Sequence, residues 1–389
     1  MDNKVKVTFM KIDLFDLPSD KIYIQLEDGF HKNLFKMAIT KAGSQSKLAE
    51  ILKRSEEKFA KDLKYIRQQE VSKWYNNYNF LRLEVANFLI KFVGLPEQDL
   101  RTNLKAIKGM TTSSPILNPK FPFTLDYEMS QLLGKICGDG CVQDFNSYSV
   151  DYVNKCEELL DEFKRLIIIK IGNTKFHEIE NNGVTVISVT GLVGYIFTTF
   201  FDFVHSRRVP NYILNGNEEV KRGFLRAIFD DEGTVSKYTG QIKLKMIHKR
   251  FVCDIKSMLK DLGIITTKIS KEKSKNRFGK IAYYFTINGR KNLELFLKKI
   301  SFTHPEKLKK LTNRLNSYKL EEYQKMEPQR LILDILSKDG SLTAKELATK
   351  INRKKRTIQF HLNNLRKKNK LTFQKIKRKF VYEYLWVKK

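Results

Sequence analysis

Two carboxylates each follow an apolar run and precede a glycine, and their type and position could hold a metal ion. LLGKICGDG at 132–140 carries Asp139 in this position, and LRAIFDDEG at 225–233 carries Glu232, 93 residues further along. A helix disfavours an acid at its C-terminus, where the macrodipole is negative. Two such acids held together repel each other unless a cation lies between them. We therefore expect a divalent metal site, although Asp-Gly is also an ordinary turn signal.

An internal repeat surrounds these acids and must position them. YSVDYVNKCEELLDEFKRL at 148–166 overlays IKLKMIHKRFVCDIKSML at 242–259, each an alternating strand, a lysine and an amphipathic helix. Two further strands follow in each copy, KFHEIE and VTVISVT or ITTKIS and IAYYFTIN, before a closing helix, GLVGYIFTTFF or RKNLELFLKKI. The order helix, strands, helix, strands, helix predicts an α+β fold with antiparallel sheets.

LLGKICGDG and LRAIFDDEG resemble the two signature helices of a LAGLIDADG (DOD-type) homing endonuclease, in its double-motif monomeric form. RVPNYILNGNEEVKRGFLRAIFDDEGTV resembles the run into the second helix, and FTINGRKNLELFLKKISFTHPEKLKKL resembles the closing segment of the family. The resemblance covers about half the chain, 124–315. It implies two pseudo-symmetric repeats, at about 124–215 and 216–315, each with an antiparallel saddle sheet.

The resemblance implies a site-specific endonuclease that hydrolyses phosphodiester bonds on both strands of duplex DNA. Asp139 and Glu232 would hold Mg²⁺ or Mn²⁺, which activates water and stabilises the leaving oxygen. Lys155 and Lys249 occupy the place where the family often carries a catalytic lysine, 16 and 17 residues after the acids. Each could stabilise charge on the phosphate or position the attacking water. The partner would be double-stranded DNA, bound by a monomer that acts as a pseudo-dimer.

Small residues predict how the two signature helices meet. Gly134 and Gly138 in the first copy and Ala227 in the second would let the helix backbones approach closely. In GQIKLKMIH, the polar residues alternate with apolar ones. Gln241, Lys243 and Lys245 therefore fall on one face, and the family places such a face in the DNA major groove.

Three residues depart from the usual pattern of the signature helices. Cys137 stands where the family often has its first Asp, a position that is usually structural. Asp231 stands where a small residue is usual at the helix contact, so we expect it at the edge or bound locally. Lys135 lies inside an apolar helix, and we expect it to face outward. Both metal-ligand positions are acidic, whereas a degenerate copy would often have lost one.

The composition indicates a globular protein that binds a polyanion. The chain has 389 residues, 41% hydrophobic and 12% aromatic, and a net charge of +30 that is spread along its length. A base-biased genome or a hot habitat could also produce this charge. The four cysteines form no CxxC pair, which argues against zinc and against a disulfide framework. With no apolar window of membrane-spanning length and no signal peptide at the start, we expect a cytoplasmic protein without a membrane partner.

The C-terminal block, 327–389, resembles a winged helix. Its helices would be RLILDILSK, SLTAKELATKI with Ser341 or Thr343 as cap, and KKRTIQFHLNNLRKKNK for recognition, followed by a two-stranded wing. The block holds 18 Lys and Arg against 5 Asp and Glu, which favours DNA binding over a protein-contacting role. The expected contacts are Arg353, Lys354, Lys355, Arg356 and Gln359.

The N-terminal block, 1–115, is predicted to be mainly α. QSKLAEILKR and QQEVSKWYNN could form a helix-turn-helix, although the segment between them is atypically long. TTSSPILNPKFPF at 111–123 is expected to be a linker. Two alternatives to a mobile, intron-homing nuclease stay open. One is a DNA-binding transcriptional regulator that no longer cuts, and the other is an RNA-binding intron maturase.

Overall fold

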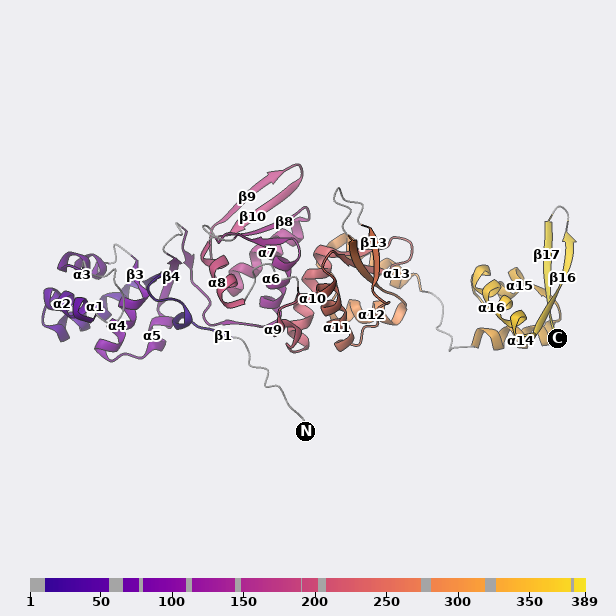
Figure 1. Ribbon diagram of the computed structural model, residues 1–389, viewed down its shortest axis with the longest axis horizontal. Helices are drawn as coiled ribbons and strands as arrows, with labels where there is room; N and C mark the ends of the chain where they lie inside the picture. Colours follow the sequence, from indigo (N-terminus) through magenta and orange to yellow (C-terminus); the bar gives the residue numbers. More distant parts are fainter. Residues whose placement is uncertain are drawn as a thin grey trace, which may run out of the picture. The chain divides into compact units, whose positions relative to one another are not determined.

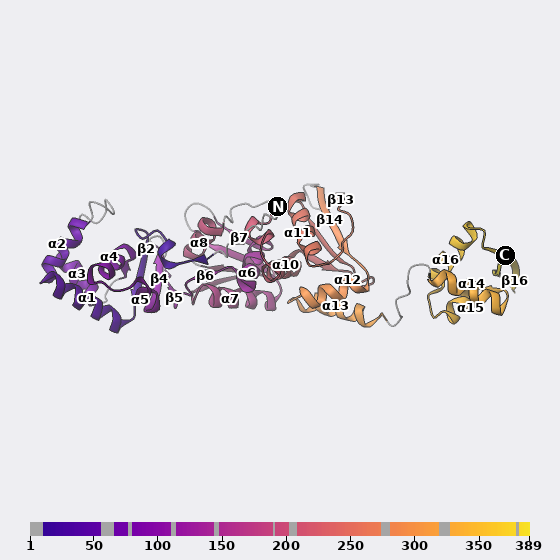
Figure 2. The ribbon, with the colours of Figure 1, turned by 90° about the horizontal axis from the view of Figure 1, so that it is seen from below.

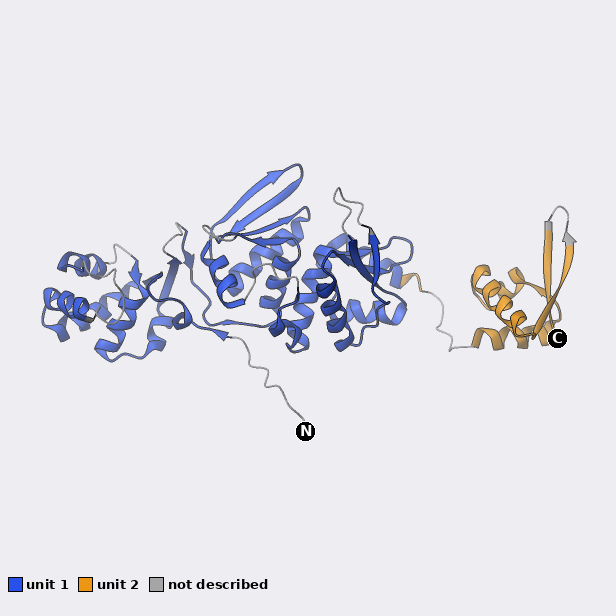
Figure 3. Cartoon of the chain, viewed as in Figure 1, with its two compact units in different colours: residues 1–315 blue, residues 316–389 orange. Residues whose placement is uncertain are grey.

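A computed structural model describes most of the chain (Figure 1). The described residues are 11–55, 66–76, 80–109, 114–143, 148–189, 191–201, 208–273, 281–318, 327–378 and 381–389. The chain divides into two compact units, Met1–Leu315 and Asn316–Lys389 (Figure 3). The boundary predicted near residue 115 lies inside the first unit, and a separate N-terminal domain stays a prediction.

Among its described residues, the N-terminal part of the first unit combines five α-helices and a short 3-10 helix with a small antiparallel sheet of strand order β3-β2-β4-β5. Its elements are β1 (Lys11–Ile12), η1 (Leu14–Asp16), β2 (Ile22–Leu26), α1 (Asp28–Ala42), α2 (Gln45–Ser55), α3 (Gln68–Tyr75), β3 (Leu81–Arg82), α4 (Leu83–Val93), α5 (Glu97–Thr102), β4 (Leu104–Gly109), β5 (Ile116–Leu117) and β6 (Phe123–Thr124). The residues between the two helices of the expected helix-turn-helix lie mostly outside the described residues. That prediction stays open.

The first repeat has the predicted order of elements. They are α6 (Tyr127–Cys137), β7 (Gly140–Val142), β8 (Val150–Asn154), α7 (Glu157–Lys170), β9 (Phe176–Asn181), β10 (Val184–Val189) and α8 (Gly191–Phe201). The antiparallel sheet runs β7-β8-β10-β9, and the hairpin β9–β10 extends beyond the helices (Figure 1). Alternate residues of β8, such as Val150 and Tyr152, are fully buried beneath the sheet.

The second repeat has the same order of elements and the same strand order, β11-β12-β14-β13. After α9 (Asn211–Leu214), its elements are α10 (Glu218–Glu232), β11 (Gly233–Val235), β12 (Ile242–Met246), α11 (Lys249–Asp261), β13 (Ser270–Lys273), β14 (Ile281–Ile287), α12 (Arg290–Lys299) and α13 (Pro305–Asn316). β13 begins where the predicted strand ITTKIS ends. Thr266 within that stretch forms an isolated bridge to Ile287, and Ser270 at its end pairs with Tyr284 as the first residue of β13.

Side-chain caps fix where the two signature helices begin. Asp126 accepts a hydrogen bond from the backbone N–H of Met129, and Asn217 does the same for Val220. From these starts the helices run side by side and pack along their length (Figure 2). Both therefore end at the same side of the contact, next to the sheets.

The second unit is a winged helix, as predicted. It comprises α14 (Glu327–Asp339), β15 (Leu342–Thr343), α15 (Ala344–Lys350), α16 (Lys355–Lys367), β16 (Leu371–Arg378) and β17 (Val381–Lys388). Thr343 and Glu346 form a capping box at the start of α15, which confirms one of the two caps expected. Its hydrophobic core contains Leu347, Ile358 and Trp386.

In the part of the chain that the structure describes, none of the helices is long and apolar enough to cross a membrane.

Candidate functional site

Glycines allow α6 and α10 to touch backbone to backbone. A Cβ on Gly134 would lie 2.7 Å from the Cβ of Ala227 and 2.8 Å from the carbonyl oxygen of Phe224. Gly138 leaves room for the carboxylate of Asp231, and Gly223 lies against the Tyr127 carbonyl. The predicted small residues therefore do meet between the helices. Gly223 completes this α6–α10 seam and was not predicted.

The seam brings the two predicted acids to neighbouring helix ends. Glu232 is the last residue of α10, and Asp139 follows the C-cap of α6. Burial and, after it, the charge of Asp139 raise the pKa of Glu232 to about 7. Burial also raises the pKa of Asp139. The charge of Asp139 thus acts on Glu232 in a partly desolvated place.

A third acid joins them from within the seam. The Tyr152 hydroxyl donates to Asp231 at 2.8 Å, and the backbone N–H of Asp139 donates to the same carboxylate at 3.3 Å. Burial raises the pKa of Asp231 to about 8, and the charge of Asp139 adds to this. Asp231 is therefore bound locally, one of the two placements expected from the sequence.

Asn154 positions the first acid. Its side-chain amide donates to Asp139 Oδ2 at 3.0 Å, and its own oxygen accepts from the backbone N–H groups of Lys155 and Cys156. Asn154 ends β8, so the strand, the start of α7 and the acid are linked. Sequence reasoning missed this residue because it looked for charged groups.

Lys307 is the cation that faces both acids. Its ammonium donates to the backbone carbonyls of Phe229, Asp230 and Asp231 in the last turn of α10, where Phe229 also accepts from the backbone N–H of Gly233. Burial lowers the pKa of Lys307, and the charges of Asp139 and Glu232 oppose this shift. The ammonium of Lys307 thus offsets the negative end of the helix dipole here. Our sequence argument lacked this group, because nothing in its spacing from either acid indicated it.

Asp230 also binds the start of α13, the helix that carries Lys307. Its buried carboxylate accepts hydrogen bonds from the backbone N–H groups of Thr303 and His304, directly before α13. The end of α10 and the start of α13 therefore cap each other. This reciprocal capping holds Glu232 against the closing segment of the second repeat.

Lys135 does not face outward, contrary to the expectation from the sequence. Its side chain is fully buried, and its ammonium lies 3.2 Å from a carboxylate oxygen of Glu162. It also lies 5.1 Å from the centre of the Tyr152 ring. A buried lysine is tolerated because this partner carries the opposite charge. The same glutamate accepts from Gln131 at 2.8 Å and from Thr303 at 3.1 Å.

Lys155 and Lys249 are both exposed. Lys155 lies between β8 and α7, and Lys249 is the first residue of α11. Neither is among the charges that shift the pKa of Asp139 or Glu232, whereas Lys307 acts on both. Their catalytic role stays a prediction.

The residues predicted to face DNA lie on the sheet of the second repeat and on the second unit. Lys243 and Lys245 share the outer face of β12, and Gln241 is exposed just before it. Lys354, Lys355 and Arg356 are exposed at the start of α16, while Arg353 and Gln359 are half-buried. On the wing, Lys375 lies 4.1 Å from the centre of the Tyr382 ring.

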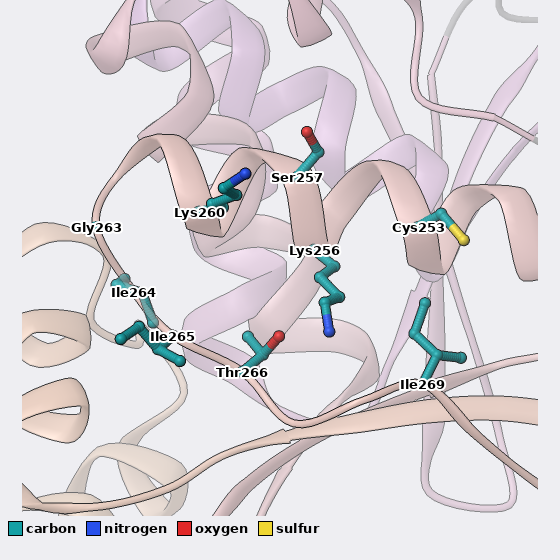
Figure 4. Close-up of a pocket in the computed structure, with 9 residues that line it drawn as sticks. All are labelled: Cys253, Lys256, Ser257, Lys260, Gly263, Ile264, Ile265, Thr266 and Ile269. Carbon is teal, nitrogen blue, oxygen red and sulfur yellow. The ribbon is translucent and has the colours of Figure 1, made fainter.

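A cavity of about 790 Å³ lies apart from these acids, between α11 and 263–269 (Figure 4). Isoleucines line it, and Lys256 points from α11 across it, donating to the Thr267 carbonyl at 2.5 Å. None of its lining residues is acidic. It does not offer the chemistry of a metal site.

Two family models match parts of the chain. The model described as "LAGLIDADG-like domain" matches residues 219–301, in the second repeat, and "Winged helix-turn-helix DNA-binding" matches residues 327–372. The first repeat lies outside the match although its strand order is the same. These matches support a DNA-binding protein with a LAGLIDADG-like domain and a C-terminal winged helix.

Curated relatives match about half of this chain. They include glutamine–fructose-6-phosphate aminotransferase of Methanocaldococcus jannaschii, 29% identical over 52% of this chain and 19% of that protein. Replication factor C small subunit of Thermococcus kodakarensis is 28% identical over 47% of this chain and 20% of that protein. The tRNA-splicing ligase RtcB of Pyrococcus furiosus is 29% identical over 45% of this chain and 20% of that protein. The chain therefore spans about a fifth of the length of these relatives.

Solved structures of similar proteins include the homing endonuclease I-DmoI in complex with DNA and Ca. It is 18% identical, with a TM-score of 0.37 over 49% of this chain and 98% of that one. Full-length DUF199/WhiA from Thermatoga maritima is 14% identical, with a TM-score of 0.37 over 64% of this chain and 93% of that one.

Proposed function

We propose that this chain is a site-specific, divalent-metal-dependent homing endonuclease, which hydrolyses phosphodiester bonds on both strands of duplex DNA. The observation that carries the proposal is the pairing of Asp139 and Glu232 at adjoining helix ends. Each sits where burial raises its pKa, and Asp139 raises that of Glu232 further. The charge of Lys307 offsets part of this repulsion, since it lowers both pKa values, and a divalent metal ion would relieve it further.

The donor set fits Mg²⁺ or Mn²⁺. Within the described ranges, no three side chains of His, Cys, Asp or Glu are grouped so that they could hold a metal. Mg²⁺ usually binds through one or two carboxylates and completes its shell with water and substrate phosphates. Asp139 and Glu232 supply such a partial set of hard oxygens. When bound there, the ion would supply Lewis-acid stabilisation of phosphodiester hydrolysis.

The side chains around the acids would hold them in place. Asn154 would orient Asp139 through its 3.0 Å hydrogen bond. Lys307 would fix the end of α10, and hence Glu232, through three backbone carbonyls. Lys155 and Lys249 would contact phosphates only when DNA is bound, because both side chains point to solvent without it.

The relatives support a function that resides in the shared segment itself. An aminotransferase, a replication factor and an RNA ligase have unrelated activities, yet each matches about half of this chain. The presence of the shared segment thus does not depend on the activity of any of these proteins. A DNA-cutting module of its own explains this pattern.

A second candidate is a DNA-binding protein on the same fold that does not cut. Lys155 and Lys249 are exposed, and neither shifts the pKa of either acid, which favours this candidate. The winged helix, with its exposed Lys355 and Arg356, would serve either function.

Cleavage of a randomised duplex-DNA library with Mg²⁺ tests the proposal, with wild type beside Asp139→Asn and Glu232→Gln. Both variants keep side-chain size and remove one charge. Cuts made by wild type and lost in either variant would support the nuclease. Wild type that binds duplex in a salt-dependent way but leaves every duplex intact would refute it and support the non-cutting protein. Structured RNA, offered in competition, identifies an RNA-binding maturase if it displaces the duplex.

A further inference from the structure

One threonine hydroxyl joins charged side chains from both repeats. The Thr303 hydroxyl accepts a hydrogen bond from Arg226 Nε at 3.0 Å and donates one to Glu162 Oε1 at 3.1 Å. The backbone N–H of the same residue donates to both carboxylate oxygens of Asp230, at 2.9 and 3.1 Å. An uncharged residue just before α13 thus binds two charged side chains of α10 and one of α7.

The glutamate in this group binds the other signature helix. Glu162 accepts from the Gln131 side chain at 2.8 Å and lies 3.2 Å from the ammonium of Lys135. These two residues are one turn apart on α6, and the two residues that Thr303 binds on α10 are one turn apart as well. The bond between Glu162 and Thr303 therefore ties one turn of α6 to one turn of α10. We call the residues of this network the clamp: Gln131, Lys135, Glu162, Arg226, Asp230 and Thr303.

The bonds of the clamp are of the strong kind. The Glu162 side chain is 12% exposed, and hydrogen bonds to a charged group are about twice as strong as those between neutral groups. Loss of the Thr303 hydroxyl would remove one donor from Glu162 and the acceptor of Arg226 Nε. Arg226 also donates to the Tyr127 hydroxyl, at 3.4 Å, but this longer bond joins the helices at the start of α6. The link nearer the other end of α6 therefore depends on Thr303.

The clamp lies directly before the two acids in both helices. Lys135 is one turn before Asp139, and Asp230 is two residues before Glu232. The glycines of the α6–α10 seam set how closely the helices approach. A residue without a side chain interlocks little with the facing helix, so it resists sliding along the helix axis only weakly. The clamp supplies that restraint, because it connects the two helices just ahead of the acids.

We propose that Thr303 is a positioning residue, whose hydroxyl couples the two repeats and so holds Asp139 and Glu232 at one spacing. The coupling follows from the contacts and does not require cleavage, whereas its effect on catalysis rests on the proposed function. A displacement near 1 Å at a catalytic site can cost about a hundredfold in rate. Removal of the hydroxyl should therefore slow cleavage although both acids are intact.

Three single substitutions in the full chain test this. Thr303→Val keeps the shape of the side chain and removes the hydroxyl, and Thr303→Ser keeps the hydroxyl. Thr312→Val is the matched control, because Thr312 is another half-buried threonine, on α13 and outside the clamp, whose hydroxyl donates to the Leu308 carbonyl at 2.9 Å. Each variant is compared with wild type by hydrogen exchange without metal, by duplex binding in EDTA and by single-turnover cleavage across Mg²⁺ concentrations.

Hydrogen exchange reports the coupling in the absence of metal and DNA. In the last turns of α6 and α10, the N–H of Gly138 bonds to the Gly134 carbonyl and that of Gly233 to the Phe229 carbonyl. Thr303→Val should speed exchange at both helix ends by about tenfold or more, the loss expected for one hydrogen bond to a charged group. Thr303→Ser and Thr312→Val should keep both ends protected.

Cleavage reports whether the coupling sets the geometry of the acids. Thr303→Val should cut a selected target about 10- to 100-fold more slowly and should need more Mg²⁺ for half of its maximal rate. Its affinity for duplex in EDTA should stay unchanged, because no clamp residue is among those expected to contact DNA. General unfolding would instead weaken binding as well. Thr303→Ser should restore cleavage, and Thr312→Val should not impair it.

Faster exchange in α10 alone would overturn the proposal, because Thr303 would then hold only its own repeat. The same effect in Thr303→Ser or in Thr312→Val as in Thr303→Val would overturn it too. If exchange rises at both helix ends but wild type leaves every duplex intact, the coupling stands and the nuclease is refuted. If wild type cuts and Thr303→Val cuts equally well, the nuclease stands and this inference falls.

Discussion

A single methyl group placed in the α6–α10 seam tests whether packing sets the geometry of the acids. In Gly134→Ala the new Cβ would lie 2.7 Å from the Cβ of Ala227 and 2.8 Å from the Phe224 carbonyl oxygen. Ordinary contact begins at 3.4 Å. The helices must therefore move apart by roughly 0.7 Å at this point, either by separating or by tilting. Either movement also takes Asp139 away from Glu232.

Stability and activity should respond differently. Overpacking costs about 1–3 kcal/mol, but replacing a glycine inside a helix by alanine returns about 1 kcal/mol. We expect a net loss of no more than about 2 kcal/mol in the free energy of unfolding. A displacement near 1 Å at a catalytic site can cost about a hundredfold in rate. Cleavage should thus fall far more than stability.

The assay pairs thermal unfolding with cleavage of a selected target. Gly29→Ala is the matched control, because it lies in α1 with nothing within 4 Å of the new Cβ. It should raise stability slightly and leave cleavage unchanged. Adding Ala227→Gly to Gly134→Ala removes one of the two close contacts, so cleavage should recover in part. Full cleavage by Gly134→Ala alone would refute the reasoning.

Three further predictions concern charge. Lys307→Met should lower the free energy of unfolding by about 2 kcal/mol in denaturant titrations, because the carbonyls of Asp230 and Asp231 lose the lysine donor. Lys309→Met, exposed on the same helix, should not lower it, and equal effects would contradict this. The pKa of Glu232 is raised from 4.5 to about 7, so folded protein without metal holds a proton that the unfolded chain releases; its stability should fall as pH rises through this window. Mg²⁺ affinity by calorimetry should rise about tenfold per pH unit below about 7, and a flat profile would exclude Glu232 as a ligand. Lys354→Ala with Arg356→Ala should make the salt slope of duplex binding shallower by about 0.9 for each phosphate that the variant no longer neutralises, and an unchanged slope would remove them from the interface.

Local patterns predicted much of the fold because short-range physics decides it. The acid-Gly pairs, the alternating strands and the cap at Thr343 each depend on neighbours within a few residues. The repeated order of elements and the winged helix followed from these patterns. β13 was misplaced because its strand is short and its alternation is weak.

The contacts around the acids could not be predicted in this way. Lys307 and Asp231 meet across 76 residues, and Lys135 meets Glu162 across 27. A lysine inside an apolar run is expected outside, because burial without a partner is costly. Only the tertiary fold supplies that partner. The acids themselves were found because their type and position, rather than their partners, carry the signal.

The seam between α6 and α10 also sets a rule for building hybrids. Each repeat contributes one helix, one sheet and one acid, and the helices touch through Gly134, Ala227 and Gly223. A half taken from a related chain can replace one repeat only if its helix is equally narrow at these points. Where that condition holds, we expect that the sheet of one half can be exchanged without moving Asp139 and Glu232 apart. The small residues therefore decide which halves can pair, and the sheets can differ between the halves that do.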